Sequence, residues 1–102
     1  MDSSRVAQYF GRRLWRQRRL AYLSQAELAR LLDLDRSEIG KLERGMRIPR
    51  LDTILKLAAG VEVDPCELIA GLRWRPRIEV PAGGTYVGRG SGSSDGRAEA
   101  RR

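Results

Sequence analysis

The chain has 102 residues, with 20 Lys or Arg and 13 Asp or Glu, so its formal net charge is +7. It contains no His and a single Cys, Cys66, which excludes a His-based catalytic triad, a His–Cys zinc site and an intramolecular disulfide. No apolar run approaches the roughly 18 residues of a membrane span, and the N-terminal residues lack the pattern of a signal peptide. We therefore expect a small cytoplasmic protein, not an enzyme, that needs no cofactor or metal and binds something acidic.

Five helices are predicted within the first 72 residues. The first helix is amphipathic, because Val6, Phe10 and Leu14 recur every four residues. Three later helices begin with Ser or Asp followed three residues on by Glu, the pattern of a capping box. These boxes are Ser24-Gln-Ala-Glu27, Asp35-Arg-Ser-Glu38 and Asp64-Pro-Cys-Glu67. The predicted helices cover about residues 4–20, 24–32, 35–45, 51–59 and 64–70.

Only Asp33 and Leu34 separate the second helix from the cap of the third. So short a connection forces two helices to cross steeply, which is the helix-turn-helix arrangement. The third helix would then turn its apolar residues, Ile39 and Leu42, toward the core. Its opposite face is predicted to carry Arg36, Ser37, Gly40 and Lys41. Because Arg and Lys donate to guanine O6 and N7 in the major groove, this face predicts a reader of duplex DNA.

Four segments of the chain resemble the Cro/repressor-type helix-turn-helix domain, also called the xenobiotic-response-element family of bacterial and phage regulators. They are Leu23-Ser-Gln-Ala-Glu-Leu-Ala29, Ile39-Gly-Lys-Leu-Glu-Arg-Gly45, Ile48-Pro-Arg-Leu-Asp-Thr-Ile-Leu55 and Val63-Asp-Pro-Cys-Glu-Leu-Ile69. Their order and spacing match the family over roughly residues 8–72. The resemblance implies an all-α, lambda-repressor-like bundle of five helices, double-stranded DNA as the ligand, and usually a two-fold dimer.

The same resemblance implies three sets of site residues. The base-reading positions of the third helix match Arg36, Ser37 and Lys41. The positions that contact DNA phosphates match Gln25, Arg44, Arg47 and Arg50. An internal ion pair that ties the first helix to the end of the third matches Arg18 and Glu43.

Four positions depart from the family pattern. Asp33 stands where the family usually has Gly in a left-handed conformation, which Asp tolerates better than most residues. Glu62, after the fourth helix, raises the same question of whether a residue other than Gly fits a left-handed conformation. Arg50 replaces the usual Ser or Thr cap of the fourth helix, which should cost about 1 kcal/mol. Gly40, within the third helix, costs about 1 kcal/mol relative to Ala and either brings the helix closer to the groove or has no role.

Residues 1–75 form the predicted helix-turn-helix domain. Residues 76–88 form an extended segment that could fold as a small hairpin, because two short alternating runs flank Pro81-Ala-Gly-Gly84. An isolated hairpin is marginal in water, so it would need a surface to pack on. Residues 89–102 form a Gly/Ser/Arg tail of linker composition, which is predicted to be disordered.

The dimer surface is expected near the fifth helix and the segment Arg73-Trp74-Arg75, since so short a helix cannot bury Trp74 alone. Cys66, in the first turn of that helix, is expected to be a small buried residue.

The leading hypothesis is a sequence-specific transcriptional regulator of the bacterial nucleoid, a homodimeric repressor that reads half-sites about 34 Å apart. An antitoxin, which would have a toxin as its protein partner, or a restriction–modification controller would use the same domain. A protein-interaction adaptor that has lost DNA binding is a hypothesis of another class. A membrane-surface role is disfavoured, because the cations of the first helix are not expected to separate from its apolar face.

Overall fold

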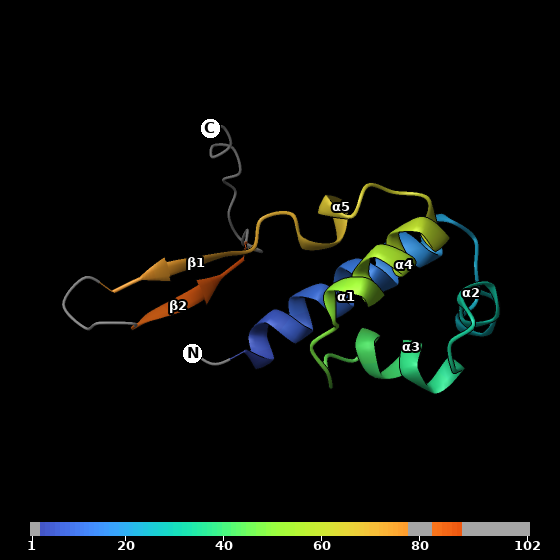
Figure 1. Cartoon of the computed structure of the whole chain (residues 1–102), viewed down its shortest axis with the longest axis horizontal. Coiled ribbons are helices and arrows are strands. Elements are labelled where there is room, and N and C mark those ends of the chain that lie inside the picture. The colour runs from blue at the N-terminus through green and yellow to red at the C-terminus, as the bar shows by residue number, and fades with distance from the viewer. Residues whose placement is uncertain (1–2, 78–82, 89–102) are drawn as a thin grey trace.

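The computed structural model describes residues 3–77 and 83–88, and within them the chain folds as a small helical bundle with a two-stranded sheet (Figure 1). The elements in chain order are α1 (Ser4–Leu20), α2 (Gln25–Leu32), α3 (Arg36–Glu43), α4 (Leu51–Val61), α5 (Cys66–Ile69), β1 (Arg73–Pro76) and β2 (Gly84–Val87). The predicted all-α fold of five helices is confirmed. No helix in these ranges has the length and apolar composition that crossing a membrane requires.

The core is built from one or two large apolar side chains of each helix. Seven of them are completely buried: Phe10, Leu14, Leu28, Ile39, Leu42, Leu57 and Leu68. Burial of a Leu, Ile or Phe side chain contributes about 1.5–3 kcal/mol each by transfer from water. Because α2 and α3 both insert residues into this cluster, their mutual crossing is fixed by the same core that holds α1 and α4.

Helix α1 presents opposite chemistry on its two sides. Its buried residues follow helical spacing and face the bundle: Ala7, Phe10, Gly11, Leu14 and Arg18. Its exposed side carries Arg5, Arg12, Arg16 and Arg19. The separation is incomplete, as expected, because Arg18 lies on the buried face and the apolar Trp15 and Leu20 are exposed. A membrane-surface role is not favoured, because the core already occupies the apolar side that a bilayer would need.

The turn between α2 and α3 has the geometry that a steep helix crossing needs. Ser24 and Glu27 form the complete predicted capping box at the start of α2. Asp33 ends α2 in a left-handed conformation with φ of 57°, as its usual tolerance of positive φ allows. Asp35, in contrast, makes no side-chain capping bond at the start of α3. That predicted box is wrong: the backbone N–H of Glu38 donates to the backbone oxygen of Asp35 at 3.0 Å, and the carboxylate of Glu38 accepts a bond from Arg47 at 2.6 Å.

Helix α4 extends two residues beyond its predicted end and stops at Glu62, which is left-handed with φ of 62°. The side chain of Arg50 does not cap α4, as expected, and bonds to Asp52 at 3.2 Å. Helix α5 is a single turn, and Asp64 accepts a bond from the backbone N–H of Cys66 at 2.8 Å. Cys66 itself is exposed, which corrects the expectation of burial. The core position in this turn belongs to Leu68.

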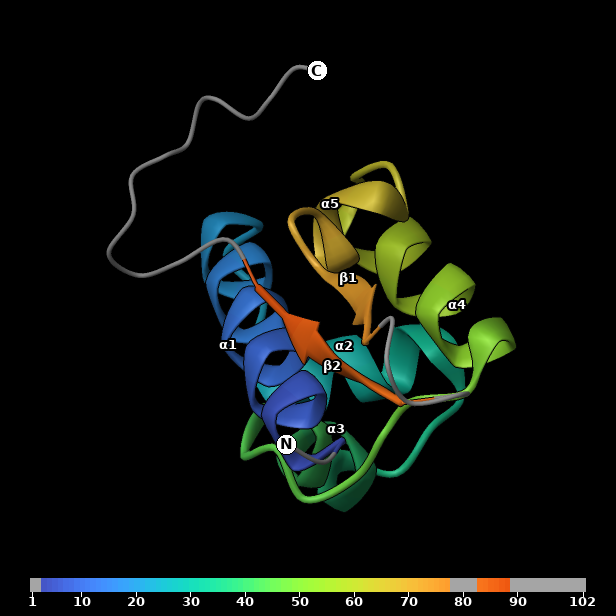
Figure 2. The same ribbon diagram turned by 90° about the vertical axis from the view of Figure 1, so that its left-hand side faces the viewer.

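The predicted hairpin is present, but its first strand begins earlier than the alternating pattern indicated. Strand β1 pairs antiparallel with β2, so that Trp74 faces Tyr86 and Pro76 faces Gly84. The rings of Trp74 and Tyr86 meet edge to face at 4.9 Å. Figure 2 shows β2 lying against α1, which supplies the packing surface that a lone hairpin lacks. Of the expected turn Pro81-Ala-Gly-Gly84, Pro81 and Ala82 lie outside the described residues and Gly84 begins β2. The expected disorder of residues 89–102 also lies outside the described residues.

Candidate nucleic-acid interface

Helix α3 turns its apolar side inward and its polar side to solvent. Ile39 and Leu42 are completely buried. On the other side Arg36 and Ser37 are exposed, and Lys41, one turn after Ser37, is partly exposed. The three predicted base-reading residues therefore share the solvent-facing side of one helix. Two guanidinium or ammonium donors and a hydroxyl can all hydrogen-bond to base edges.

Gly40 does not belong to that exposed face, contrary to the sequence-based expectation, because it is buried. A Cβ atom at this position would lie 3.1 Å from Nη1 of Arg44 and 3.8 Å from Oε1 of Gln25. The glycine thus leaves room for the polar side chains of Arg44 and Gln25 above the middle of α3. This contact explains why a residue that weakens a helix by about 1 kcal/mol stands here.

A buried ion pair holds α3 against α1. Nε of Arg18 donates to Oε2 of Glu43 at 2.6 Å, and Nη2 of Arg18 donates to Oε1 of Glu43 at 3.0 Å. The two side chains are only 8% and 4% exposed. A third guanidinium bond, from Nη1 of Arg18 to the backbone oxygen of Leu23 at 2.8 Å, reaches the start of α2. Such a bidentate, charge-assisted contact fixes the relative position of the two helices more tightly than a single neutral hydrogen bond.

Gln25 joins this network, a role that sequence reasoning missed. Its Nε2 atom donates to Oε1 of Glu43 at 3.0 Å. A primary amide has two N–H groups, and this bond uses one of them. Glu43 therefore holds the Gln25 amide at the first residue of α2, close to the backbone N–H groups of that helix end, where an anion is favoured. No local sequence pattern links residues 25 and 43, so only the folded chain reveals the contact.

The three loop arginines extend the basic surface beyond α3. Arg44, Arg47 and Arg50 are all exposed. Two of them rest on neighbouring carboxylates, Arg47 on Glu38 at 2.6 Å and Arg50 on Asp52 at 3.2 Å. Solvent-exposed pairs of this kind contribute about 0–1 kcal/mol. A phosphate group can therefore replace either carboxylate at little cost.

The balance of charge on this side of the molecule favours an anionic ligand. Residues 36–50 contain five basic and two acidic side chains. One of the acids, Glu43, is already neutralised by Arg18 inside the protein. The surface formed by α3, the start of α2 and the loop before α4 is therefore cationic, while its supporting network is buried and fully bonded.

Comparison with known proteins agrees with this geometry. A protein-family model, HTH_3 (helix-turn-helix), matches residues 15–68. Among solved structures, the chain is similar to the restriction-modification controller protein C.AhdI from Aeromonas hydrophila, at 44% identity and a TM-score of 0.64. That alignment covers 67% of this chain and 99% of the controller. About a third of this chain therefore has no counterpart in the controller.

Two further solved structures are similar. One is an HTH_3 family transcriptional regulator from Vibrio cholerae, at 25% identity and a TM-score of 0.63, covering 68% of this chain and 39% of that chain. The other is the hypothetical transcription factor NHTF from Neisseria, at 29% identity and a TM-score of 0.61, covering 68% and 79%. No curated protein matches the chain.

Proposed function

We propose that this chain, which belongs to the helix-turn-helix (HTH_3, Cro/C1-type) family of DNA-binding transcription regulators, reads duplex DNA with α3 and acts as a dimeric repressor. The orientation of α3 is the observation that supports its proposed role in reading the base sequence of DNA. Arg36, Ser37 and Lys41 lie on its solvent-facing side, opposite the buried Ile39 and Leu42. We assign these three residues to base edges in the major groove.

Gln25, Arg44, Arg47 and Arg50 are proposed to hold the sugar-phosphate backbone on either side of the inserted helix. The bond from Gln25 to Glu43 supports this role, because it holds the amide in place before DNA arrives. The exposed carboxylate partners of Arg47 and Arg50 support it as well, since a phosphate can replace them. Contacts of this kind position the protein and supply most of the affinity that does not depend on sequence.

The dimer is proposed to form through α5 and the Trp74 region. Ile69 and Trp74 are large apolar side chains in this region that remain 42% and 45% exposed. Burying such exposed apolar side chains against a second copy would favour association. A two-fold dimer would place two copies of α3 about 34 Å apart, one helical turn of DNA. By binding across a promoter, such a dimer would repress transcription.

A more specific role is favoured by one comparison. The similarity to a restriction-modification controller covers nearly the whole of that protein at 44% identity. We therefore place the chain among controllers of this kind ahead of antitoxins, whose toxin partner has no support from the comparisons, and ahead of an adaptor without DNA binding. The cationic side of α3 argues against the adaptor.

Salt dependence of binding to a random-sequence duplex tests the proposed backbone contacts. Each cation placed on a phosphate steepens the slope of log affinity against log salt by about 0.9, so the three loop arginines together predict about −2.7 per protomer. Arg47→Gln should make the slope shallower by about 0.9, whereas the matched control Arg30→Gln, on the exposed side of α2, should not. A slope near zero, or equal slopes for the two variants, would contradict the backbone contacts.

A further inference from the structure

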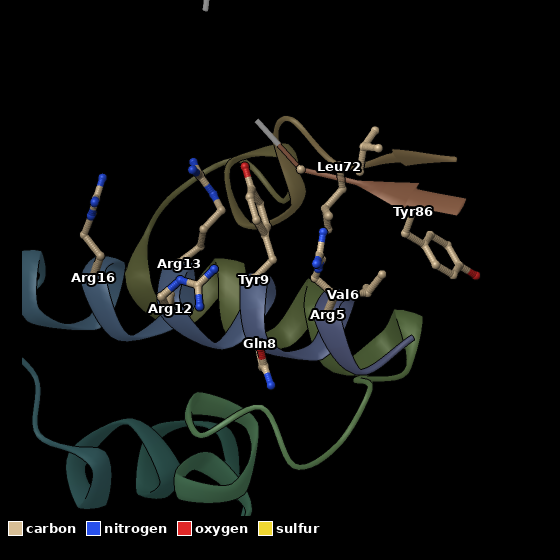
Figure 3. A pocket seen from close by; sticks show the side chains of 11 residues that line it. Arg5, Val6, Gln8, Tyr9, Arg12, Arg13, Arg16, Leu72 and Tyr86 are labelled. Carbon is tan, nitrogen blue, oxygen red and sulfur yellow. The ribbon is translucent and has the colours of Figure 1, made fainter. Parts of the chain in front are cut away.

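A groove lies between the N-terminal half of α1 and the hairpin, away from α3. Its volume is about 550 Å³, and its lining combines arginines with tyrosines and apolar side chains. Figure 3 shows Arg13, Arg16 and Tyr9 pointing from α1 toward this space, whereas the side-chain end of Gln8, a residue that borders the groove, points away from them. Gln8 packs against Gly45, the residue just beyond α3. The groove and the proposed DNA-reading face are therefore on different sides of α1.

Three arginines of this groove have no acidic partner within residues 3–77 and 83–88. Arg5, Arg12 and Arg16 follow one line along α1, seven and four residues apart, and none forms an ion pair with the described residues. Arg13, by contrast, is paired with Glu67 at 3.6 Å. Like charges on one helix face repel each other. An anionic ligand in the groove would relieve that repulsion.

The walls of the groove are held in place before any ligand enters. The hydroxyl of Tyr9 donates to the backbone oxygen of Ala70 at 2.6 Å, which ties α1 to the segment leading into β1. Gly88, just after β2, lies so close to Tyr9 that a Cβ atom there would be 2.6 Å from the ring. Nε of Arg13 also donates to the backbone oxygen of Glu67. A groove fixed by such contacts loses little conformational freedom on binding.

The groove is lined by apolar as well as cationic side chains. This mixture determines whether a DNA duplex or an acidic peptide fits the groove better. Val6, Leu72 and Val87 line the groove together with Tyr9 and Tyr86. A DNA duplex is convex and presents a continuous row of phosphates, so it favours protruding cations over a hollow with apolar walls. A peptide can place apolar side chains in the hollow and carboxylates on its arginine rim. The volume is in the range of about 300–1,000 Å³ that is typical of ligand pockets.

We propose that this groove binds a segment of a partner protein in which acidic and apolar side chains alternate. Arg5, Arg12 and Arg16 bind the carboxylates of the segment, and its apolar side chains pack between α1 and the hairpin. Because the groove is separate from α3, the partner binds whether or not the chain is on DNA. The site would couple a DNA-bound regulator to a second protein.

Fluorescence anisotropy with the full chain tests the proposal, using as probe a short fluorescein-labelled peptide of alternating Glu and Leu. The double variant Arg12→Glu/Arg16→Glu should weaken binding by about tenfold or more, because two attractive contacts become repulsive. The matched control Arg30→Glu/Lys56→Glu makes the same charge change at exposed positions of α2 and α4. This control variant should weaken peptide binding by about twofold at most, because only the long-range attraction between the chain and the probe is reduced, and salt screens that attraction. Equal weakening in the two variants would overturn the proposal.

Two further arms separate peptide recognition from unspecific charge attraction and from DNA contact. A probe in which Ser replaces Leu should bind at least about fivefold more weakly, because it leaves the apolar walls uncovered; equal affinity for the two probes would overturn the proposal. On a random-sequence duplex, the groove variant should lose no more affinity than the control variant. A selective loss of duplex binding with peptide binding retained would instead make the groove a DNA contact. The milder Arg12→Gln/Arg16→Gln variant should give an intermediate loss of peptide binding, which guards against an effect of misfolding.

Discussion

The buried carboxylate of Glu43 is the side chain on which the position of α3 depends most. It accepts two bonds from Arg18 and one from Gln25, and so connects α1, α2 and α3 at one point. Its side chain is only 4% exposed. The pair adds little net stability over a well-packed apolar alternative, but breaking it leaves Arg18 as an uncompensated charge in the interior.

Glu43→Gln should therefore lower the free energy of unfolding by about 3–5 kcal/mol, because Arg18 would remain buried without its counter-ion. Urea unfolding followed by circular dichroism measures this difference. The matched control is Glu38→Gln, which removes an acid of the same helix whose partner, Arg47, is exposed. It should change the free energy of unfolding by about 1 kcal/mol or less. If Glu43→Gln were as mild as Glu38→Gln, the network would not have the structural role described.

Some side-chain roles could be predicted from the sequence and others could not. The partners Arg18 and Glu43 were inferred from the family resemblance, and the structure brings them together. The burial of Gly40 and the bond of Gln25 were missed, since both depend on how the end of α3 packs against the start of α2. The exposure of Cys66 was missed for a related reason. A helix of one turn has room for a single fully buried core residue, and Leu68 takes that position.

The helices are delimited by local chemistry, which is why their order and most of their bounds follow from sequence. Ser24 begins α2 with a complete capping box. Asp33 and Glu62 end α2 and α4 in left-handed conformations, as glycines usually do. Tyr22 does the same after α1 with φ of 61°, which nothing in its residue type indicated. Tertiary contacts decided the exceptions. Asp35 does not cap α3, and β1 begins at Arg73, where pairing with Val87 sets the register.

The capping box of α2 predicts a dependence of stability on pH. The pKa of Glu27 is lowered, first by its bond to the backbone N–H of Ser24 and then by interaction with the Ser24 side chain. The ionised carboxylate of Glu27 therefore contributes to the stability of the folded state. This contribution is complete above the usual pKa of about 4.5, and it is lost as the pH falls through the lower pKa of the folded state.

Ser24→Ala should accordingly destabilise the protein by about 1 kcal/mol at neutral pH through the lost cap. Because this variant keeps the Ser24 backbone N–H, the largest cause of the lowered pKa of Glu27, the acid dependence is tested with Glu27→Gln, whose stability should decline less than that of the wild type between neutral pH and pH values below the Glu27 transition. Thermal unfolding at a series of pH values measures both effects. Parallel curves for Glu27→Gln and the wild type over that interval would contradict a role of the box in the acid dependence.

The molecule as a whole has two cationic surfaces separated by α1. One is formed by α3, the start of α2 and the loop arginines, and is the proposed DNA-binding surface. The other is the groove between α1 and the hairpin, whose strands lie beyond the part matched by the family model. Composition and motifs pointed to the first surface. They could not reveal the second, because it exists only where the hairpin folds back onto α1 (Figure 2).

We propose that the solvent-facing side of α3 reads base sequence. Selection of bound sites from a pool of random duplexes, performed with the wild type and with Arg36→Ala/Lys41→Ala, is the decisive experiment. The wild type should enrich a pseudo-palindrome with half-sites about 34 Å apart. The variant should lose that preference while retaining salt-dependent binding to duplexes of any sequence. Enrichment of the same site by both proteins, or no enriched site for the wild type, would contradict the proposal.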